Sequence, residues 1–221
     1  MSASVLIIAL LSAPFPTEVP EGEEPLVAVE ALHTSFRFDI RYATKDNFAG
    51  VAAYPIARCV LRRSVAERMV RAQRWLDEKH PGLRLVFKDC YRPDRVQRIL
   101  WNAVKGTPKQ RYVANPDTGT GSIHSYGAAV DLTLADAEGK ELDMGTPYDH
   151  LGELAEPRHE ERFLRERKLS SAEVERRRIL RRALVEIAGM KPIPNEWWHF
   201  NAPDALRKKY SRLDVPLEAV P

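Results

Sequence analysis

Cysteine is scarce in this sequence of 221 residues, which contains only Cys59 and Cys90. Two cysteines cannot form the framework of a disulfide-rich domain, and neither lies in the CxxC spacing of a thiolate metal site. Because free cysteine is among the most buried residue types, we expect two buried free thiols. One bridge between them stays open as the alternative if the chain is exported.

An excess of one charge is also lacking, because 34 Lys and Arg residues face 31 Asp and Glu residues, which gives a formal net charge of +3. Nucleic-acid binding is not expected, since it needs clustered basic residues beside stacking aromatics or a known fold signature. The most basic stretch, residues 158–182, has ten Lys or Arg against five Glu. We interpret it as a solvated helical face with ion pairs, and attraction to an anionic polymer is the alternative.

Long hydrophobic runs are absent too, and the apolar residues 5–11 are far too few to span a bilayer. They resemble the core of a short secretory signal that lacks the usual preceding positive charges. We therefore expect a periplasmic or secreted protein without stable membrane insertion, and a cytoplasmic one is the alternative. The expected organisation is a signal-like segment with an acidic, proline-rich linker (1–25), one folded domain (26–205) and a C-terminal tail (206–221).

Apolar periodicity indicates both strands and helices in the folded part. Strands are expected over residues 36–42, 83–90, 128–134 and 196–200. Helices are expected over residues 94–104 and from Ser64 and Ser170, each of which has Glu three positions later as in a capping box. Their expected inward positions are Val65, Met69, Ala72, Leu76, Val174, Ile179, Ala183, Leu184 and Ile187. Without regular βαβ alternation, the pattern favours a single α+β domain whose central, mainly antiparallel sheet is flanked by helices.

Two short segments bring together residues that ligate metals. His124 follows a glycine-rich loop, and Asp131 lies seven positions later within the apolar strand. An ionised carboxylate there is costly unless a cation or hydrogen bonds compensate it; the alternative is an aspartate that points outward. Glu196 precedes His199 by three positions, and both side chains can reach one site only if the backbone bends, because i and i+3 lie on opposite faces of a strand.

His124, Asp131 and His199 together offer two imidazoles and one carboxylate. Three protein ligands with a fourth position for water are typical of catalytic zinc, whereas structural zinc sites fill all four positions. Glu196 would be the general base next to this zinc site on the sheet. Arg92, in a Tyr-Arg-Pro step after an expected strand, would face a developing oxyanion; an ordinary surface ion pair is the alternative.

The motifs SxHxxGxAxD (122–131), EWWH (196–199) and YRP (91–93) resemble those of D-alanyl-D-alanine dipeptidases of the VanX type. These belong to a wider group of zinc peptidases that includes D,D-carboxypeptidases and cell-wall endopeptidases. Residues 42–48 (YATKDNF) and 144–149 (MGTPYD) also match the dipeptidase pattern. The resemblance therefore extends from about residue 39 to residue 200, and the two added segments favour the dipeptidase branch.

The resemblance implies a role for each matching residue. Zinc, one ion per chain, would be held by His124, Asp131 and His199, with Glu196 as the general base and Arg92 stabilising the tetrahedral intermediate. Asp149 would meet the substrate ammonium, and Ser122, Tyr42 and Asp89 would lie near the small substrate pocket. Tyr126 departs from the family pattern, which has arginine there, and this departure concerns substrate range.

The expected function is zinc-dependent hydrolysis of the D-alanyl-D-alanine dipeptide to free D-alanine, in cell-wall turnover or recycling. One alternative is a D,D-carboxypeptidase or endopeptidase that acts on longer peptidoglycan peptides. Another is a non-catalytic zinc module that binds wall peptides, although Glu196 and Arg92 would then have no purpose. The expected partner is a small D,D-dipeptide, with no nucleic acid, and the sequence does not indicate an oligomeric state.

Overall fold

A mixed sheet forms the centre of the computed structural model, which describes residues 15–203 and 209–221. Its strand order is β2 (Arg37–Phe38), β4 (Arg84–Asp89), β5 (Ala129–Ala135), β7 (His199–Asn201) and β6 (Lys191–Pro192). Only the β2–β4 pair is parallel within this sheet. β1 (Leu26–Ala28) and β3 (Val60–Arg62) form a separate antiparallel pair. The predicted α+β domain with a mainly antiparallel sheet is confirmed.

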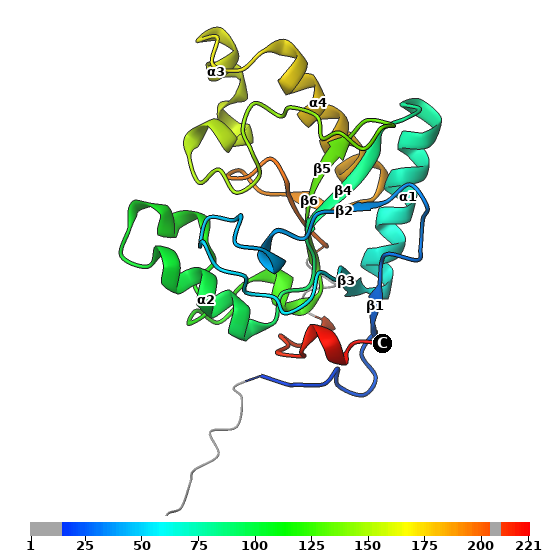
Figure 1. The fold of residues 1–221 in the computed structure, drawn as a ribbon, viewed down its shortest axis with the longest axis vertical. Helices are drawn as coiled ribbons and strands as arrows, with labels where there is room; N and C mark the ends of the chain where they lie inside the picture. Colours follow the sequence, from blue (N-terminus) through cyan, green and yellow to red (C-terminus); the bar gives the residue numbers. More distant parts are fainter. Residues whose placement is uncertain (1–14, 204–208) are drawn as a thin grey trace, which may run out of the picture.

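Helices lie on both sides of these strands: in Figure 1, α1 (Arg63–Lys79) and α2 (Asp94–Val104) flank them, and α3 (Glu160–Arg165) and α4 (Ser171–Arg181) lie together at one end. A π-helical segment, η6 (Arg182–Ile187), continues α4. No helix in the described part of the chain is long and apolar enough to cross a membrane. The signal-like residues 1–14 lie outside the described residues.

The helix predictions are largely confirmed. α2 has the predicted bounds, and Ser170 and Glu173 form the predicted capping box at α4. The predicted inward stripe of α1 is buried. The prediction that Ile187 faces inward is wrong, because this residue is 36% exposed. The capping box at Ser64 is also wrong, since α1 begins at Arg63 and the Ser64 N–H donates instead to Glu24 Oε2 at 2.9 Å. A carboxylate from outside the helix thus binds the free N–H group.

Two strand predictions need correction as well. Residues 36–42 form a strand only at Arg37–Phe38, and a 3-10 turn, η1, follows at Arg41–Ala43. Residues 196–200 form a strand only from His199 onward. In both segments the rest of the backbone turns toward the site described below, which an alternating pattern cannot reveal.

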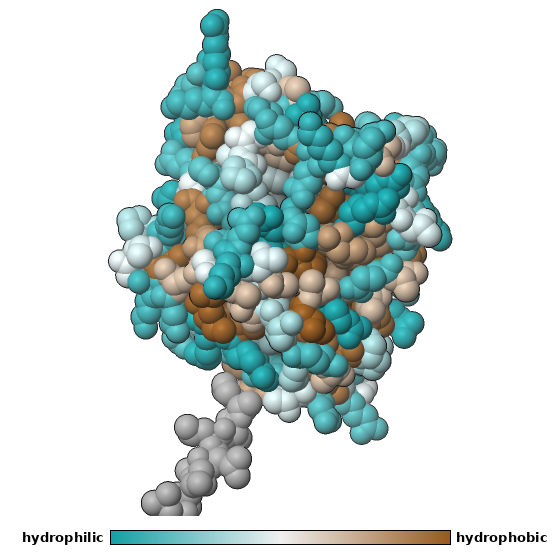
Figure 2. Space-filling model, in the orientation of Figure 1, coloured by the Kyte–Doolittle hydropathy of each residue, from teal (hydrophilic) through white to brown (hydrophobic). Residues whose placement is uncertain are grey.

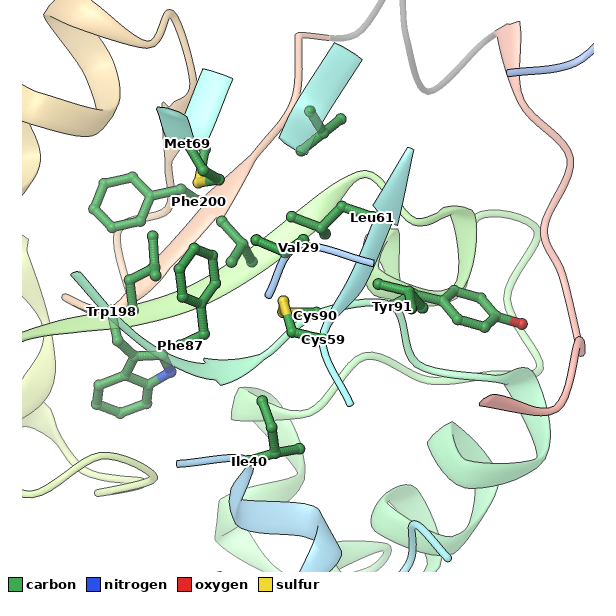
Figure 3. Close-up of a cluster of buried hydrophobic side chains, with 14 of the residues drawn as sticks. Val29, Ile40, Cys59, Leu61, Met69, Phe87, Cys90, Tyr91, Trp198 and Phe200 are labelled. Atoms are coloured by element: carbon green, nitrogen blue, oxygen red, sulfur yellow. A yellow bond between two sulfur atoms is a disulfide. The ribbon is translucent and has the colours of Figure 1, made fainter. Parts of the chain in front are cut away.

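Strand β5 separates the hydrophobic core from a polar face. Val130, Leu132 and Leu134 belong to the main hydrophobic cluster, whereas Asp131 and Thr133 point to the opposite face because side chains alternate along a strand. Figure 3 shows side chains of this core from several elements, including Met69 of α1, Phe87 of β4 and Phe200 of β7. All three are completely buried.

The C-terminal segment, expected as a tail, contributes Leu213, Val215, Leu217 and Val220 to the same core. The Tyr91 hydroxyl donates to the Val215 carbonyl at 3.1 Å.

Large exposed hydrophobic residues are scattered in the described part of the chain (Leu32, Val51, Ile99 and Ile187). On the face in Figure 2, hydrophobic patches are interrupted by hydrophilic residues.

Cys59 and Cys90 form a disulfide, so the expectation of free thiols is wrong. Their Cα atoms are 5.2 Å apart, within the range that a bridge requires. Figure 3 shows the bridge among buried side chains at the point where β3 begins and β4 has ended. The sequence does not reveal this proximity, because 31 positions separate the two cysteines and the fold alone brings them together.

The disulfide gives a test of the fold. Protein unfolded in denaturant without reductant is expected to expose no reactive thiol, and two reactive thiols per chain would contradict the bridge. The double variant Cys59→Ala/Cys90→Ala is expected to lose about 3–4 kcal/mol of unfolding free energy in urea titrations, because a closed loop of this length restricts the unfolded chain.

Candidate active site

Three adjacent elements bring the predicted metal ligands together. Antiparallel pairing of β5 with β7 sets Asp131 directly opposite His199. His124 lies on a 3-10 turn, η3 (Ile123–Tyr126), immediately before β5. Asp131 is therefore between the two histidines because of sheet register and a short turn.

The ligand atoms of these three residues converge on one point. Asp131 Oδ1 lies 3.0 Å from His199 Nδ1 and 3.3 Å from His124 Nε2. The two imidazole nitrogens are 3.2 Å apart, and the candidate ligand atoms all lie within 4.8 Å of one another. Asp131 and His124 are each only 2% exposed, and His199 is 9% exposed.

The other nitrogen of each imidazole has an oxygen acceptor. His124 Nδ1 lies 2.7 Å from the Cys90 carbonyl, and His199 Nε2 lies 2.9 Å from Asn201 Oδ1. If both nitrogens donate, the hydrogen bonds fix tautomers in which His124 Nε2 and His199 Nδ1 carry lone pairs. Two lone pairs and a carboxylate oxygen that face one point need a cation between them. The donor set therefore fits a zinc ion.

The turn that carries His124 is held by a close approach of two backbones. Gly127 has φ of 69°, and a Cβ atom there would lie 2.6 Å from a methyl carbon of Leu26. The buried Arg62 donates from Nε to the Tyr126 carbonyl at 2.9 Å, and its own N–H donates to the Gly127 carbonyl at 3.0 Å. The glycine of the motif is thus required by conformation and by space.

The charge of Asp131 is compensated from two sides. Its Oδ2 accepts a hydrogen bond from the Tyr148 hydroxyl at 3.0 Å, while Oδ1 faces the histidines. Burial by itself would raise the pKa of Asp131, but in the protein without metal the charges and hydrogen bonds that His124 and His199 supply when protonated outweigh burial and hold that pKa well below its usual range. Asp131 is therefore available as an ionised ligand.

Glu196 reaches the same site because the backbone bends before β7. Its Oε2 lies 3.9 Å from His199 Nδ1, and its side chain is 11% exposed. The predicted bend is confirmed, since β7 begins only at His199. Burial raises the pKa of Glu196 to about 8 in the protein without metal, and the charges of Asp131 and Asp149 add to this rise. A carboxylate with such a pKa can both accept and return a proton.

Buried hydrogen-bond partners hold Arg92 at the site. Its Nη2 lies 2.5 Å from Asp89 Oδ2 and 3.8 Å from Asp131 Oδ2, and its Nη1 donates to Gln97 Oε1 at 2.7 Å. The Tyr54 hydroxyl donates to the other oxygen of Asp89 at 2.6 Å. Asp89, expected near the substrate, thus lies behind Arg92 and orients it.

Sequence reasoning missed several positioning residues. Gln97 not only accepts from Arg92 but also donates to the Ala114 carbonyl at 2.6 Å, which joins the arginine to the wall of the site. Tyr54 and Asn201 were missed in the same way. The partner of Tyr54, Asp89, is 35 positions away in the sequence. Gln97 and Asn201 lie only five and two positions from Arg92 and His199, but spacing alone does not predict that these side chains meet.

A cavity of about 270 Å³ opens beside these groups. Arg92, Glu196 and the candidate metal ligands line it, together with Tyr42, Ser122 and Asp149. Tyr126 is not among the lining residues, and its hydroxyl donates to the Thr120 carbonyl at 3.0 Å.

Asp149 offers an unpaired carboxylate oxygen at this cavity. Its Oδ1 accepts from the Tyr42 hydroxyl at 3.0 Å, whereas Oδ2 is buried and has no hydrogen-bond partner within the described residues. Burial, with a contribution from the charge of Asp131, raises the pKa of Asp149 to about 8. A buried polar atom without a partner is costly, so it marks a place where a hydrogen-bond donor can bind.

The sequence is similar to known proteins over most of its length. The Peptidase M15 family profile, described as D-ala-D-ala dipeptidase, matches residues 23–216. The chain is 34% identical over 180 residues to the D-alanyl-D-alanine dipeptidase of Escherichia coli (strain K12), which covers 81% of this chain and 86% of that protein. It is 32% identical over 187 residues to the D-alanyl-D-alanine dipeptidase of Enterococcus faecium, with coverage of 77% and 87%.

The ligand set predicts metal binding that depends on Asp131. One zinc ion per chain is expected to bind in isothermal titration, and Asp131→Ala is expected to weaken binding by at least about 100-fold, because a carboxylate ligand is lost. Glu138→Ala, an exposed carboxylate beyond the end of β5, is the matched control. Unchanged zinc affinity in Asp131→Ala would contradict the ligand assignment.

The raised pKa of Asp149 predicts a pH-dependent stability of the metal-free protein. Between about pH 4 and about pH 8 the folded state keeps a proton that the unfolded chain loses, so the unfolding free energy falls as pH rises. Asp149→Asn removes the titrating carboxyl, so its unfolding free energy should not fall in this way. In urea titrations, its unfolding free energy is expected to rise relative to that of wild type by roughly 2–4 kcal/mol across that pH window. Asparagine also tolerates the φ of 63° at this position.

The control for this measurement is the exposed Asp143→Asn. A stability difference between wild type and Asp149→Asn that stays constant with pH would contradict the raised pKa.

Proposed function

The chain belongs to the D-Ala-D-Ala dipeptidase family, Peptidase M15, and we propose that it is a zinc-dependent enzyme that hydrolyses D-alanyl-D-alanine to free D-alanine. The observation that carries this proposal is the convergence on one small cavity of three metal-ligating atoms, a carboxylate with a raised pKa and a buried arginine. Such a cavity suits a small substrate, since its volume of about 270 Å³ is slightly below the usual range for ligand sites, about 300–1,000 Å³.

The free amino end of the dipeptide is assigned to Asp149. Its unpaired Oδ2 is a strong acceptor for an ammonium, and the Tyr42 hydroxyl holds the other oxygen in place. Ammonium binding would return the Asp149 carboxyl to its ionised form, because an opposite charge lowers the pKa of a buried acid. This contact would also fix the position of the peptide bond relative to Glu196.

Zinc would be held by His124, Asp131 and His199, and when bound it supplies a Lewis acid that polarises the scissile carbonyl and acidifies water. Glu196 would accept the proton of the attacking water at its carboxylate and then pass it to the leaving amine. The burial that raises the pKa of Glu196 suits both steps, since the group must gain and lose a proton in each turnover.

Arg92 would stabilise the negative charge that develops on the carbonyl oxygen. Its guanidinium is held by Asp89 and Gln97, so it does not have to reorganise as the charge forms. Such preorganised charge is worth several kcal/mol of barrier in a site that excludes water.

We further propose that the protein acts outside the cytoplasm, in the turnover or recycling of cell-wall dipeptide. The Cys59–Cys90 bridge supports this location, since disulfides form and persist mainly in oxidising compartments. The apolar residues 5–11 are consistent with an export signal.

The proposal predicts zinc-dependent release of D-alanine from D-Ala-D-Ala by the purified full chain. Glu196→Gln is expected to lower kcat about 1,000-fold while zinc binding remains, because the proton acceptor is lost but the ligands are not. Glu186→Gln, an exposed glutamate on η6, is the matched control.

Absence of release by folded, zinc-loaded wild type would contradict the dipeptidase proposal. Cleavage of longer wall peptides by that protein would then indicate a carboxypeptidase or endopeptidase, and tight binding without cleavage would indicate a binding module.

A further inference from the structure

A free dipeptide carries a positive charge at one end and a negative charge at the other. Asp149 accounts for the ammonium, but the carboxylate also needs a partner in the cavity. Two arginines line that cavity, Arg92 and Arg111. Arg92 is already bonded to Asp89 through two of its nitrogens and to Gln97 through the third. The N–H groups that Arg92 has left are assigned above to the carbonyl oxygen of the scissile bond, so Arg111 is the remaining arginine that could bind the carboxylate.

Arg111 lies on the 3-10 turn η2 (Pro108–Tyr112), and a chain of hydrogen bonds orients it. Its Nη2 donates to the Tyr112 hydroxyl at 2.6 Å, and its guanidinium carbon lies 4.8 Å from the centre of the Tyr112 ring. The Tyr112 hydroxyl in turn donates to the buried Glu156 at 2.7 Å. The guanidinium is thus pre-positioned although its side chain is 56% exposed.

These contacts leave N–H donors of Arg111 available, and Glu156 does not neutralise Arg111 alone. Glu156 already accepts from Arg158 at 2.7 Å and lies 3.3 Å from His159, whereas its distance to Arg111 is 3.5 Å. Within residues 15–203 and 209–221, Nε and Nη1 of Arg111 have no hydrogen-bond partner. Each of these nitrogens can donate a charge-assisted hydrogen bond to a carboxylate oxygen.

We propose that Arg111 binds the C-terminal carboxylate of the substrate. This inference rests on the proposed function and extends it, because it makes Arg111 a determinant of specificity. With Asp149 at the amino end and Arg111 at the carboxyl end, the cavity selects a peptide whose two termini are both free. A longer wall peptide that ends in D-Ala-D-Ala has no ammonium at this position, and an amidated dipeptide has no carboxylate.

The test compares D-Ala-D-Ala with its C-terminal amide, D-Ala-D-alaninamide, as substrates of the zinc-loaded full chain. Arg111→Met is expected to raise KM for the free acid about tenfold while kcat changes little, because one partly exposed charge-assisted contact is lost. Its kinetics with the amide should change less than about twofold. Arg111→Lys, which keeps the charge, should recover part of the loss for the acid.

Lys109→Met is the matched control, since Lys109 lies on the same turn, is exposed and does not line the cavity. It should leave both substrates unaffected. An equal loss for acid and amide in Arg111→Met, or no loss for either, would overturn the role of Arg111 while leaving the proposed function intact.

Binding separates this inference from the proposed function. Calorimetric titration of both dipeptides into zinc-loaded Glu196→Gln, with and without Arg111→Met, measures the contact without turnover. Weaker binding of the acid alone supports the role of Arg111 even if wild type hydrolyses neither substrate, a result that would contradict only the proposed function. Equal affinities of the two Glu196→Gln proteins for the acid would overturn the inference.

Discussion

The burial of an ionised Asp131 in the central strand is the constraint on which the rest of the site depends. Removing a carboxylate from water costs several kcal/mol. The fold offsets part of this cost with a tyrosine hydroxyl on Oδ2, and Oδ1 faces the two imidazoles. Those imidazoles are themselves oriented by the Cys90 carbonyl and by Asn201. The arrangement is complete only with a cation at its centre, so the electrostatics of the strand already indicate a metal site.

The surrounding scaffold holds this cluster in place from several directions. The disulfide joins the start of β3 to the end of β4, next to the carbonyl that accepts from His124. Arg62 of β3 holds the turn that carries His124, and the Leu213 N–H donates to the Ser125 carbonyl at 2.7 Å. The C-terminal segment is therefore part of the support of the site. Catalytic geometry needs such support, because small displacements of reacting groups slow a reaction strongly.

Features with a local cause could be predicted from the sequence. The bounds of α2, the capping box at Ser170 and the strand around Asp131 follow from signals within a few residues, and the structure contains all of them. The Ser64 prediction failed because Glu24, 40 positions away, supplies the cap. The prediction of free thiols failed for the same reason, because Cys59 and Cys90 are 31 positions apart in the sequence.

The site shows the same division between local and distant causes. Its candidate metal ligands could be named from motif spacing, and the structure brings those three residues together. Tyr54 could not be named, since only the fold brings it near Asp89. Gln97 lies five positions from Arg92, but that spacing does not by itself indicate a contact. Arg111 has no local signal either, because its potential role depends on the charges that other segments place around one cavity.

Zinc-edge X-ray absorption on the full chain loaded with one equivalent of zinc identifies the atoms that hold the metal. We expect a first shell of nitrogen and oxygen only, with the outer-shell scattering of two imidazole rings. That pattern would disappear in the double variant His124→Ala/His199→Ala. Sulfur in the first shell, or a shell of oxygen without imidazole, would contradict the claim that His124, Asp131 and His199 hold the metal.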